Sequence, residues 1–156
     1  MVIKMAIRNI VKEGDPVLRK TCRSVLAFDD KLAQLLDDMK DTMYKAEGVG
    51  LAAPQVGILK RVCIVDVGDG LIELVNPVIV EQSGSQTGGE GCLSSPGEFG
   101  NVTRPMEVTV RAQDRFGKTF TVTGTELKAR AFCHEIDHLN GILFKDKVEG
   151  GIRIEK

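Results

Sequence analysis

The order of the expected elements predicts an α+β fold, with antiparallel strands packed around a central helix. A long amphipathic helix comes first, a series of short β-rich segments follows, and a second helix comes last. Strands and helices do not alternate as they do in a doubly wound parallel sheet, so the sequence argues against that class. With 156 residues, the chain is expected to form one domain, residues 1–156, with a sizeable core.

The first helix is expected to run from Asp29 or Asp30, either of which can cap it, to about Ala46. Its apolar residues recur every three or four positions and form one face: Leu32, Leu35, Leu36, Met39 and Met43. Gly48 is available to end the helix. We interpret this face as core packing rather than as a ligand site.

Strands are expected after this helix at residues 61–67, 72–81, 106–113 and 119–125. The last two are predicted to form a hairpin around residues 114–118. The glycine-rich segment 48–55, which precedes the first strand, lacks the spacing of a dinucleotide-binding or phosphate-binding loop. Taken alone, it is interpreted as a flexible connection between helix and strand.

The second helix is predicted over about residues 126–140. Residues at helical spacing share one stripe on it: Leu127, Ala131, His134 and His138. A second, apolar stripe holds Phe132, Ile136 and Leu139, and the pattern is interrupted only by Lys128, Arg130, Cys133 and Asp137. A helix that is apolar on most sides is expected to be buried. Asn140 and Gly141 supply a left-handed stop.

Composition argues against several classes of protein. The net charge of −1 and the pI of about 6.1 give no basic surplus for binding nucleic acid. The first ten residues hold no apolar run of signal-peptide length, and no segment reaches the roughly 18 apolar residues of a membrane span. We therefore expect a cytoplasmic protein whose four cysteines, Cys22, Cys63, Cys92 and Cys133, do not form disulfides.

Both histidines of the chain lie in the motif His134-Glu135-Ile136-Asp137-His138. Residues four apart lie on one helical face, so both imidazoles can reach a single metal ion. Glu135, between them, is a candidate general base toward metal-bound water. Because buried histidines and a buried glutamate are costly without partners, a metal-binding helix is favoured over a chance motif on a solvated helix.

A catalytic site of this kind needs a third protein ligand and leaves a fourth position for water. No other histidine exists in the chain. Cys92 is the strongest candidate, since it is expected in a turn where Gly91 allows close approach. A glutamate or aspartate elsewhere would also serve, so spacing alone leaves this ligand open. Cys133 points about 100° away from His134 around the helix and is an unfavourable choice.

Three segments are more specific together than any one alone: GVGLAAPQVG at 48–57, EGCLS at 90–94 and HEIDHLNG at 134–141. In this order and at this separation they resemble the three motifs of the peptide deformylase family. The resemblance extends from about Gly14 to Phe144. Members are metallohydrolases that remove the N-formyl group from the initiator methionine of nascent chains. They favour Fe2+ in the cell and also work with Ni2+, Co2+ or Zn2+.

The resemblance implies a role for each matching residue. Cys92, His134 and His138 would bind the metal, with water in the fourth position. Glu135 would take a proton from that water and later deliver one to the leaving amine. A thiolate beside two imidazoles donates charge to the metal and suits iron or zinc.

The resemblance also implies where the substrate lies. The Gln55 side-chain amide and the Leu93 backbone N–H would face the developing oxyanion. The Gly50 carbonyl would accept from the formamide N–H. Backbone groups near Val49 and Gly91 would pair with the peptide as an added strand.

The stripe on the second helix indicates where the methionine side chain binds. Ala131 and Leu127 lie one and two turns before His134, so they are expected to face the same cavity as the metal. Together with Val49, they are predicted to line an apolar methionine pocket.

Two features depart from the family pattern. Cys133 stands where many members have glutamine, which is expected to leave activity intact but to add sensitivity to oxidation. Residues 148–156 look like a loop and a short strand, whereas many members carry a longer C-terminal helix that docks on the ribosome. The implied partners are nascent formyl-Met peptides, with transient ribosome contact by such a helix placed in doubt. No nucleic-acid or membrane partner is indicated.

Two other functions compete with deformylation. A zinc endopeptidase with this motif usually needs a third histidine or an acid downstream, where the nearby acids are Asp146 and Glu149. A non-enzymatic module with a closed structural metal site needs a fourth protein ligand, for which Cys133 is badly placed. An assay of formyl-Met-Ala against an internal peptide would separate the three hypotheses.

Overall fold

The computed structural model describes residues 6–155 of the chain. Its helices are α1 (Asp30–Lys45) and α2 (Leu127–Leu139), with short 3-10 helices η1 (Pro16–Arg19), η2 (Ala53–Val56) and η3 (Phe144–Lys147). Its strands are β1 (Gly50–Ala52), β2 (Val62–Val65), β3 (Ile72–Ser83), β4 (Gln86–Cys92), β5 (Ser95–Arg104), β6 (Glu107–Gln113), β7 (Thr119–Thr125) and β8 (Val148–Ile154). No helix in this described part is long and apolar enough to cross a membrane.

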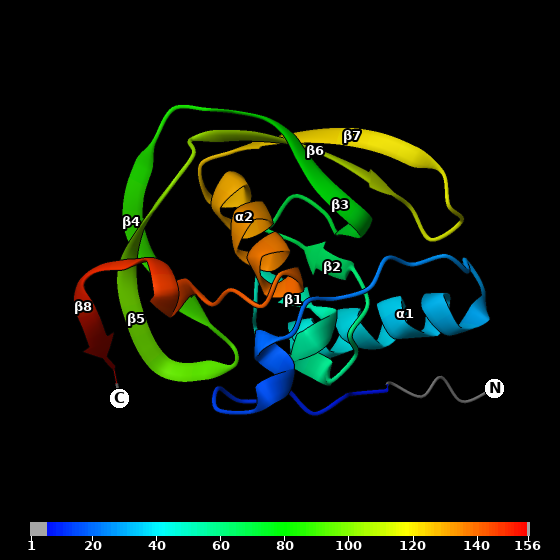
Figure 1. Ribbon diagram of the computed structural model, residues 1–156, viewed down its shortest axis with the longest axis horizontal. Helices are drawn as coiled ribbons and strands as arrows, with labels where there is room; N and C mark the ends of the chain where they lie inside the picture. The colour runs from blue at the N-terminus through cyan, green and yellow to red at the C-terminus, as the bar shows by residue number, and fades with distance from the viewer. Residues whose placement is uncertain (1–5, 156) are drawn as a thin grey trace.

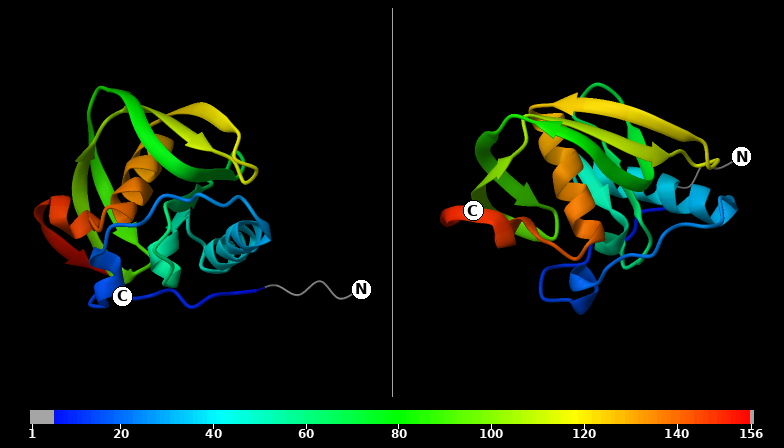
Figure 2. Two further views of the ribbon diagram at one scale, coloured as in Figure 1. Left: turned by 45° about the vertical axis from the view of Figure 1, so that its right-hand side comes forward. Right: turned by 45° about the horizontal axis from the view of Figure 1, so that its top comes forward.

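The strands form two antiparallel sheets with α2 between them (Figure 1). The larger sheet has the order β1-β2-β3-β6-β7, and the smaller has the order β4-β5-β8. Helix α2 contacts β1, β2, β6 and β7 of the larger sheet and β5 of the smaller one. The two turned views show the same central position of α2 (Figure 2). The predicted α+β class, with antiparallel strands around a central helix, is therefore confirmed.

The first helix begins and ends close to where the sequence predicts. Asp29 is its N-cap, and its Oδ1 accepts a hydrogen bond from the Leu32 N–H at 3.1 Å. The helix ends at Lys45, and the Gly48 N–H then returns to a helical carbonyl. Its apolar face packs on β1 and β2 and forms a core of its own. The chain leaves α1 directly toward the glycine-rich segment.

That glycine-rich segment differs from the prediction. Residues 48–55 were expected to be a flexible connection, but Gly50–Ala52 is a strand paired with β2, and Ala53–Val56 is a 3-10 helix. All residues of β1 are buried. Small side chains let this strand lie against α2, so its glycines reflect close packing rather than freedom of movement.

The expected strands all form, with ends shifted by a few residues. The predicted hairpin between β6 and β7 is present, and Asp114 N–H donates to the Lys118 carbonyl across its turn at 2.9 Å. The hairpin of β4 and β5 was not predicted as strands. Its sequence is rich in glycine and lacks the alternation of apolar and polar residues that marks a half-buried strand.

The second helix is buried over most of its surface, as its two stripes predict. Arg130 and Cys133, two of the residues that interrupt the apolar pattern, are buried as well. The helix stops where expected: Gly141 has φ +73°, and a Cβ there would lie 2.5 Å from the Arg19 carbonyl oxygen. The end of α2 is therefore packed against Arg19, the last residue of η1.

Candidate metal centre

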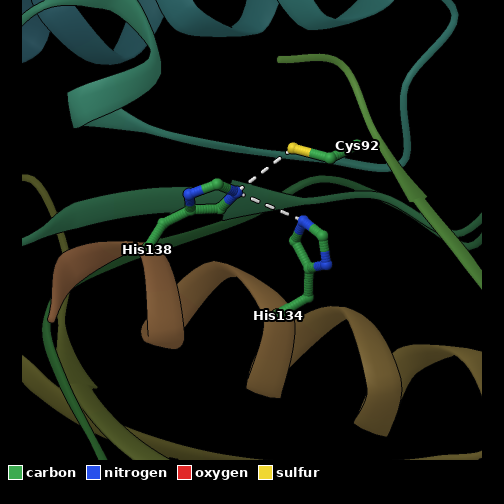
Figure 3. A group of neighbouring side chains, drawn as sticks. All are labelled: Cys92, His134 and His138. Carbon is green, nitrogen blue, oxygen red and sulfur yellow. Dashed lines mark hydrogen bonds between the residues drawn. The ribbon is translucent and has the colours of Figure 1, made fainter. Parts of the chain in front are cut away.

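Helix α2 and the end of β4 bring three potential ligand atoms together (Figure 3). The Cys92 Sγ lies 3.3 Å from the His138 Nε2, which lies 3.2 Å from the His134 Nε2. All three atoms lie within 4.8 Å of one another. Cys92 is the last residue of β4 and pairs with Ser95 across a two-residue turn, so its thiol is held by the hairpin.

These atoms fit a four-coordinate metal ion. Metal–nitrogen bonds of about 2.05 Å and a metal–sulfur bond of about 2.3 Å place tetrahedral ligands about 3.3–3.6 Å apart. The two close separations at this site are near that range. His138 is 1% exposed, and burial, followed by the neighbouring His134, lowers its pKa well below the ordinary value. His138 therefore favours the neutral form that binds metals.

The tautomer of His134 also suits metal binding. Its Nδ1 lies 2.6 Å from Oε1 of Glu90, so the imidazole N–H donates to that carboxylate. In the neutral ring, the Nε2 lone pair is then left to face Cys92 and His138. The ring of Phe144 stacks on His134, with centroids 6.2 Å apart, which further fixes the plane of the imidazole.

Glu90 belongs to a buried charge cluster that sequence reasoning missed. Arg104 donates to both of its oxygens, at 2.6 and 3.2 Å, and Arg130 donates to Oε2 at 2.7 Å. Burial by itself would raise the pKa of Glu90, but the hydrogen bonds from His134 and Arg104 hold it well below its usual range. The sequence offered one indication that Glu90 lies at the site, because it stands two residues before Cys92 in the EGCLS segment.

Glu135 lies beside the ligand atoms and is not one of them. Its Oε2 is 4.0 Å from the His134 Nε2, and among residues 6–155 its buried Oε1 has no hydrogen-bond partner. Burial raises its pKa to about 7. A Cβ on Gly50 would collide with this carboxylate, so the glycine makes room for it. Glu135 is thus held beside the three ligand atoms, and among the described residues one of its carboxylate oxygens has no hydrogen-bond partner.

Gln55 faces the centre from η2. Its Oε1 accepts from the Ala52 N–H at 3.0 Å, which fixes the orientation of the amide. Its Nε2 donates to the Ser94 Oγ at 3.1 Å and lies 3.4 Å from the Cys92 Sγ. A fixed N–H donor therefore lies beside the Cys92 sulfur.

A cavity of about 450 Å³ opens onto this centre. The predicted site residues that line it are Val49, Gly50, Gln55, Gly91, Cys92, Leu93, Leu127, Ala131, His134 and Glu135. His138 lies deeper, beneath this surface. Phe99 and Pro96 add apolar wall that was not predicted.

Gly91 makes room for a neighbouring ring, a role that the sequence did not indicate. It was expected to allow close approach to the metal. A Cβ at Gly91 would lie 2.7 Å from the Phe99 ring on the paired strand. The glycine therefore makes room for Phe99, which forms part of the cavity wall.

The residues invoked by the competing functions lie elsewhere. Asp146 is paired with Arg19, and Glu149 accepts from Thr103. Over the described residues, the cluster with metal-ligand geometry consists of Cys92 and the two histidines, without Cys133. Burial raises the pKa of the Cys133 thiol, which argues against the expected sensitivity to oxidation at this residue.

Comparison with known proteins gives consistent similarities. The family model described as polypeptide deformylase matches residues 7–152. A peptide deformylase from Alkaliphilus metalliredigens (strain QYMF) is 61% identical over 144 residues, which cover 92% of this chain and 98% of that protein. Another, from Agathobacter rectalis, is 55% identical over 148 residues, covering 95% of this chain and 94% of that protein.

Solved structures agree with the sequence similarities. A peptide deformylase from Legionella pneumophila superimposes with a TM-score of 0.90 at 48% identity and covers 93% of this chain and 88% of its own. The enzyme from Synechococcus elongatus in complex with actinonin gives 0.89 at 41% identity, with coverages of 96% and 82%. The match spans all three motifs and both sheets. The chain therefore belongs to the polypeptide deformylase family.

Proposed function

We propose that this protein hydrolyses the formamide of formyl-methionine at the N-terminus of nascent polypeptides. The observation that carries the proposal is the convergence of Cys92, His134 and His138 at one end of a cavity, with Glu135 beside them. Family membership supports the same reaction. Hydrolysis of an amide needs an activated water, a proton carrier and donors to an oxyanion, and the cavity holds a candidate for each.

The three ligands would hold one divalent ion, and we propose Fe2+. The family is metal-dependent, and a donor set of one thiolate and two imidazoles suits iron as well as zinc, nickel and cobalt. When bound, the ion supplies Lewis acidity and lowers the pKa of a coordinated water. Metal analysis of anaerobically purified protein, with activity measured on the same sample, tests the choice of Fe2+.

Glu135 is proposed as the group that moves the proton. With a pKa of about 7, its carboxylate can accept a proton from the attacking water and return it to the amine that leaves. The Gln55 Nε2 and the Leu93 N–H are proposed to stabilise the oxyanion that forms meanwhile. Both line the cavity, and the Gln55 amide is already oriented. One such donor is typically worth about 10²–10³ in rate.

The peptide is proposed to lie along the rim formed by β1 and β4. The Gly50 carbonyl would accept from the formamide N–H, while backbone near Val49 and Gly91 would pair with the peptide as a strand. The methionine side chain would pack on Leu127 and Ala131. Leu127 is half exposed at the cavity, and burial of a methionine against it stabilises the complex by about 1.5–3 kcal/mol.

An assay with matched peptides tests this function. Formyl-Met-Ala should be hydrolysed to formate and Met-Ala, whereas an internal peptide bond in an unformylated peptide should not be cleaved. Cleavage of the internal peptide would favour an endopeptidase. Stoichiometric metal without either activity would favour a structural site.

Transient contact with the ribosome is proposed as well, and the last element that the structure describes is a strand rather than a helix. Residues Val148–Ile154 form β8, which pairs with β5. Co-sedimentation of the protein with ribosomes carrying nascent formylated chains tests the contact. Equal recovery with ribosomes and with buffer alone would rule it out.

A further inference from the structure

The turn between β4 and β5 is held from outside the cavity by the N-terminal segment. The Glu13 N–H donates to the Ser94 carbonyl at 2.8 Å, and the Val11 N–H donates to the Gln55 carbonyl at 2.7 Å. In Figure 1 this segment, drawn in blue, runs along the lower edge of the molecule. It therefore joins η2 to the turn, the two elements that carry the proposed oxyanion donors, Gln55 and Leu93.

The Glu13 side chain adds a second connection. The Ser95 Oγ donates to the Glu13 Oε2 at 3.0 Å, and the Lys145 Nζ lies 2.6 Å from the same oxygen. Lys145 comes from η3 and also pairs with Glu98 on β5 at 2.6 Å. The hydrogen bond from Lys145 lowers the pKa of Glu13, so the acceptor is charged at neutral pH. Charged acceptors form the stronger hydrogen bonds.

Ser94 links this connection to the donor side chain. Its carbonyl accepts from Glu13, and its buried hydroxyl accepts from the Gln55 Nε2 at 3.1 Å. The turn is thus held against η2 through both its backbone and its side chains. Oxyanion donors act only when placed to within about 0.5 Å, so small shifts of this turn matter.

We propose that Glu13 is a positioning residue, which fixes the turn bearing the Leu93 N–H against η2 and so sets the distance between the two oxyanion donors. The inference rests on the proposed function, since it concerns the transition state of that reaction. Glu13 lines a separate hollow on the outer side of the turn, together with Arg19 and Lys145. Its effect must therefore pass through Ser94 and Ser95 rather than through substrate.

Kinetics of two matched variants test the proposal. Glu13→Ala should lower kcat on formyl-Met-Ala by about 3- to 10-fold, the range expected for one lost hydrogen bond that supports the transition state. KM and metal content should stay unchanged, because the peptide and the metal are held by other groups. Arg19 lines the same hollow and pairs with Asp146, and Arg19→Ala should leave both constants unchanged.

Two further variants distinguish a positioning role of Glu13 from a general loss of stability in the protein. Glu13→Gln keeps a carbonyl that can accept from Ser95, so it should restore most of the lost kcat. Ser95→Ala in the Glu13→Ala background should cause no further loss, because both changes remove the same hydrogen bond. Additive losses, or a kcat in Glu13→Gln as low as in Glu13→Ala, would contradict the proposed route.

A spectroscopic measurement does not depend on turnover. In the Zn2+-loaded protein, Glu13→Ala should lower the NMR order parameters of the Leu93 and Ser94 amides, whereas Arg19→Ala should not. Lack of deformylase activity in the wild-type protein would refute the proposed function and leave this comparison valid. Unchanged order parameters with unchanged kcat in Glu13→Ala would overturn the positioning role, as would an equal fall of kcat in Arg19→Ala.

Discussion

Glu135 shows how burial and chemistry combine in one side chain. The residue is 4% exposed, and within the described chain its Oε1 lacks a hydrogen-bond partner. Such an arrangement costs stability, because a buried charged group without full compensation is unfavourable. The same burial raises the pKa to about 7, where a carboxyl group can both accept and release a proton. The burial that destabilises the fold is therefore also what gives this carboxyl group a pKa suited to proton transfer.

Replacing Glu135 should separate metal binding from catalysis. Glu135→Gln is expected to keep the metal and to lose about 10²–10⁴-fold in kcat, because the amide cannot carry the proton. Cys92→Ala should lose metal and activity together. Metal content and kcat measured on the same preparations test both. If Glu135→Gln instead loses its metal, the carboxylate is a ligand or a structural group and the proposed mechanism is wrong.

Ala131 tests the methionine pocket. Its small side chain lines the cavity one turn before His134, so Ala131→Phe should fill the space that the methionine occupies. KM for formyl-Met peptides should rise by at least about tenfold, while KM for formyl-Ala peptides changes little. Metal content serves as the control. Equal changes for both substrates would place the methionine elsewhere.

At the scale of the elements, sequence patterns predict the helices and strands whose apolar residues recur at a regular spacing. Helices α1 and α2 and the β6–β7 hairpin follow from apolar stripes, caps and turn residues. Strands β1, β4 and β5 were not predicted, because glycines replace the alternating side chains that mark a strand. Those glycines make room for Glu135 and Phe99, and such contacts between distant segments leave no local pattern.

Contacts between distant segments also limited what the sequence could predict of the metal centre. The two histidines were placed by their spacing, whereas spacing left Cys92 as the strongest of several candidates until the hairpin was seen to bring it beside them. Glu90 and Arg104 were missed because a buried ion pair between β4 and β5 has no fixed spacing along the chain. Glu13 was missed for the same reason, since its contacts reach 81 to 132 residues along the chain, from Ser94 to Lys145.

The end of α2 provides a prediction at this scale. Gly141→Ala should destabilise the protein by at least about 2 kcal/mol, because alanine is strained at φ +73° and its Cβ would meet the Arg19 carbonyl. That corresponds to a fall in Tm of roughly 4–8 °C. Gly150→Ala is the control: it has φ +79° with nothing within 4 Å of a Cβ, so it tests strain alone. Equal losses in both variants would exclude the contact with Arg19.

For the whole molecule, the metal centre joins the smaller sheet to the central helix. Cys92 ends β4, while both histidines belong to α2, so one ion would cross-link the two elements. Buried ion pairs from Glu90 to Arg104 and Arg130 lie beside it and connect the same parts. The ion is therefore expected to contribute to stability as well as to catalysis.

Removal of the metal should lower Tm. An ion present at about 1,000 times its Kd stabilises the folded state by about 4 kcal/mol, which corresponds to roughly 10 °C for a chain of this size. Thermal unfolding with and without a chelator measures the shift. Cys92→Ala, which is expected to lack metal, should show no further shift with the chelator. The same Tm for wild-type protein in both conditions would mean that the ion does not cross-link β4 and α2.

The tight packing of Gly50 against Glu135 has a consequence for inhibition. Every codon change that replaces a glycine adds a Cβ, and at this position a Cβ would displace the carboxylate proposed to carry the proton. A compound could gain its affinity from hydrogen bonds to the Gly50 backbone. Any substitution of Gly50 that weakened its binding would then also inactivate the enzyme.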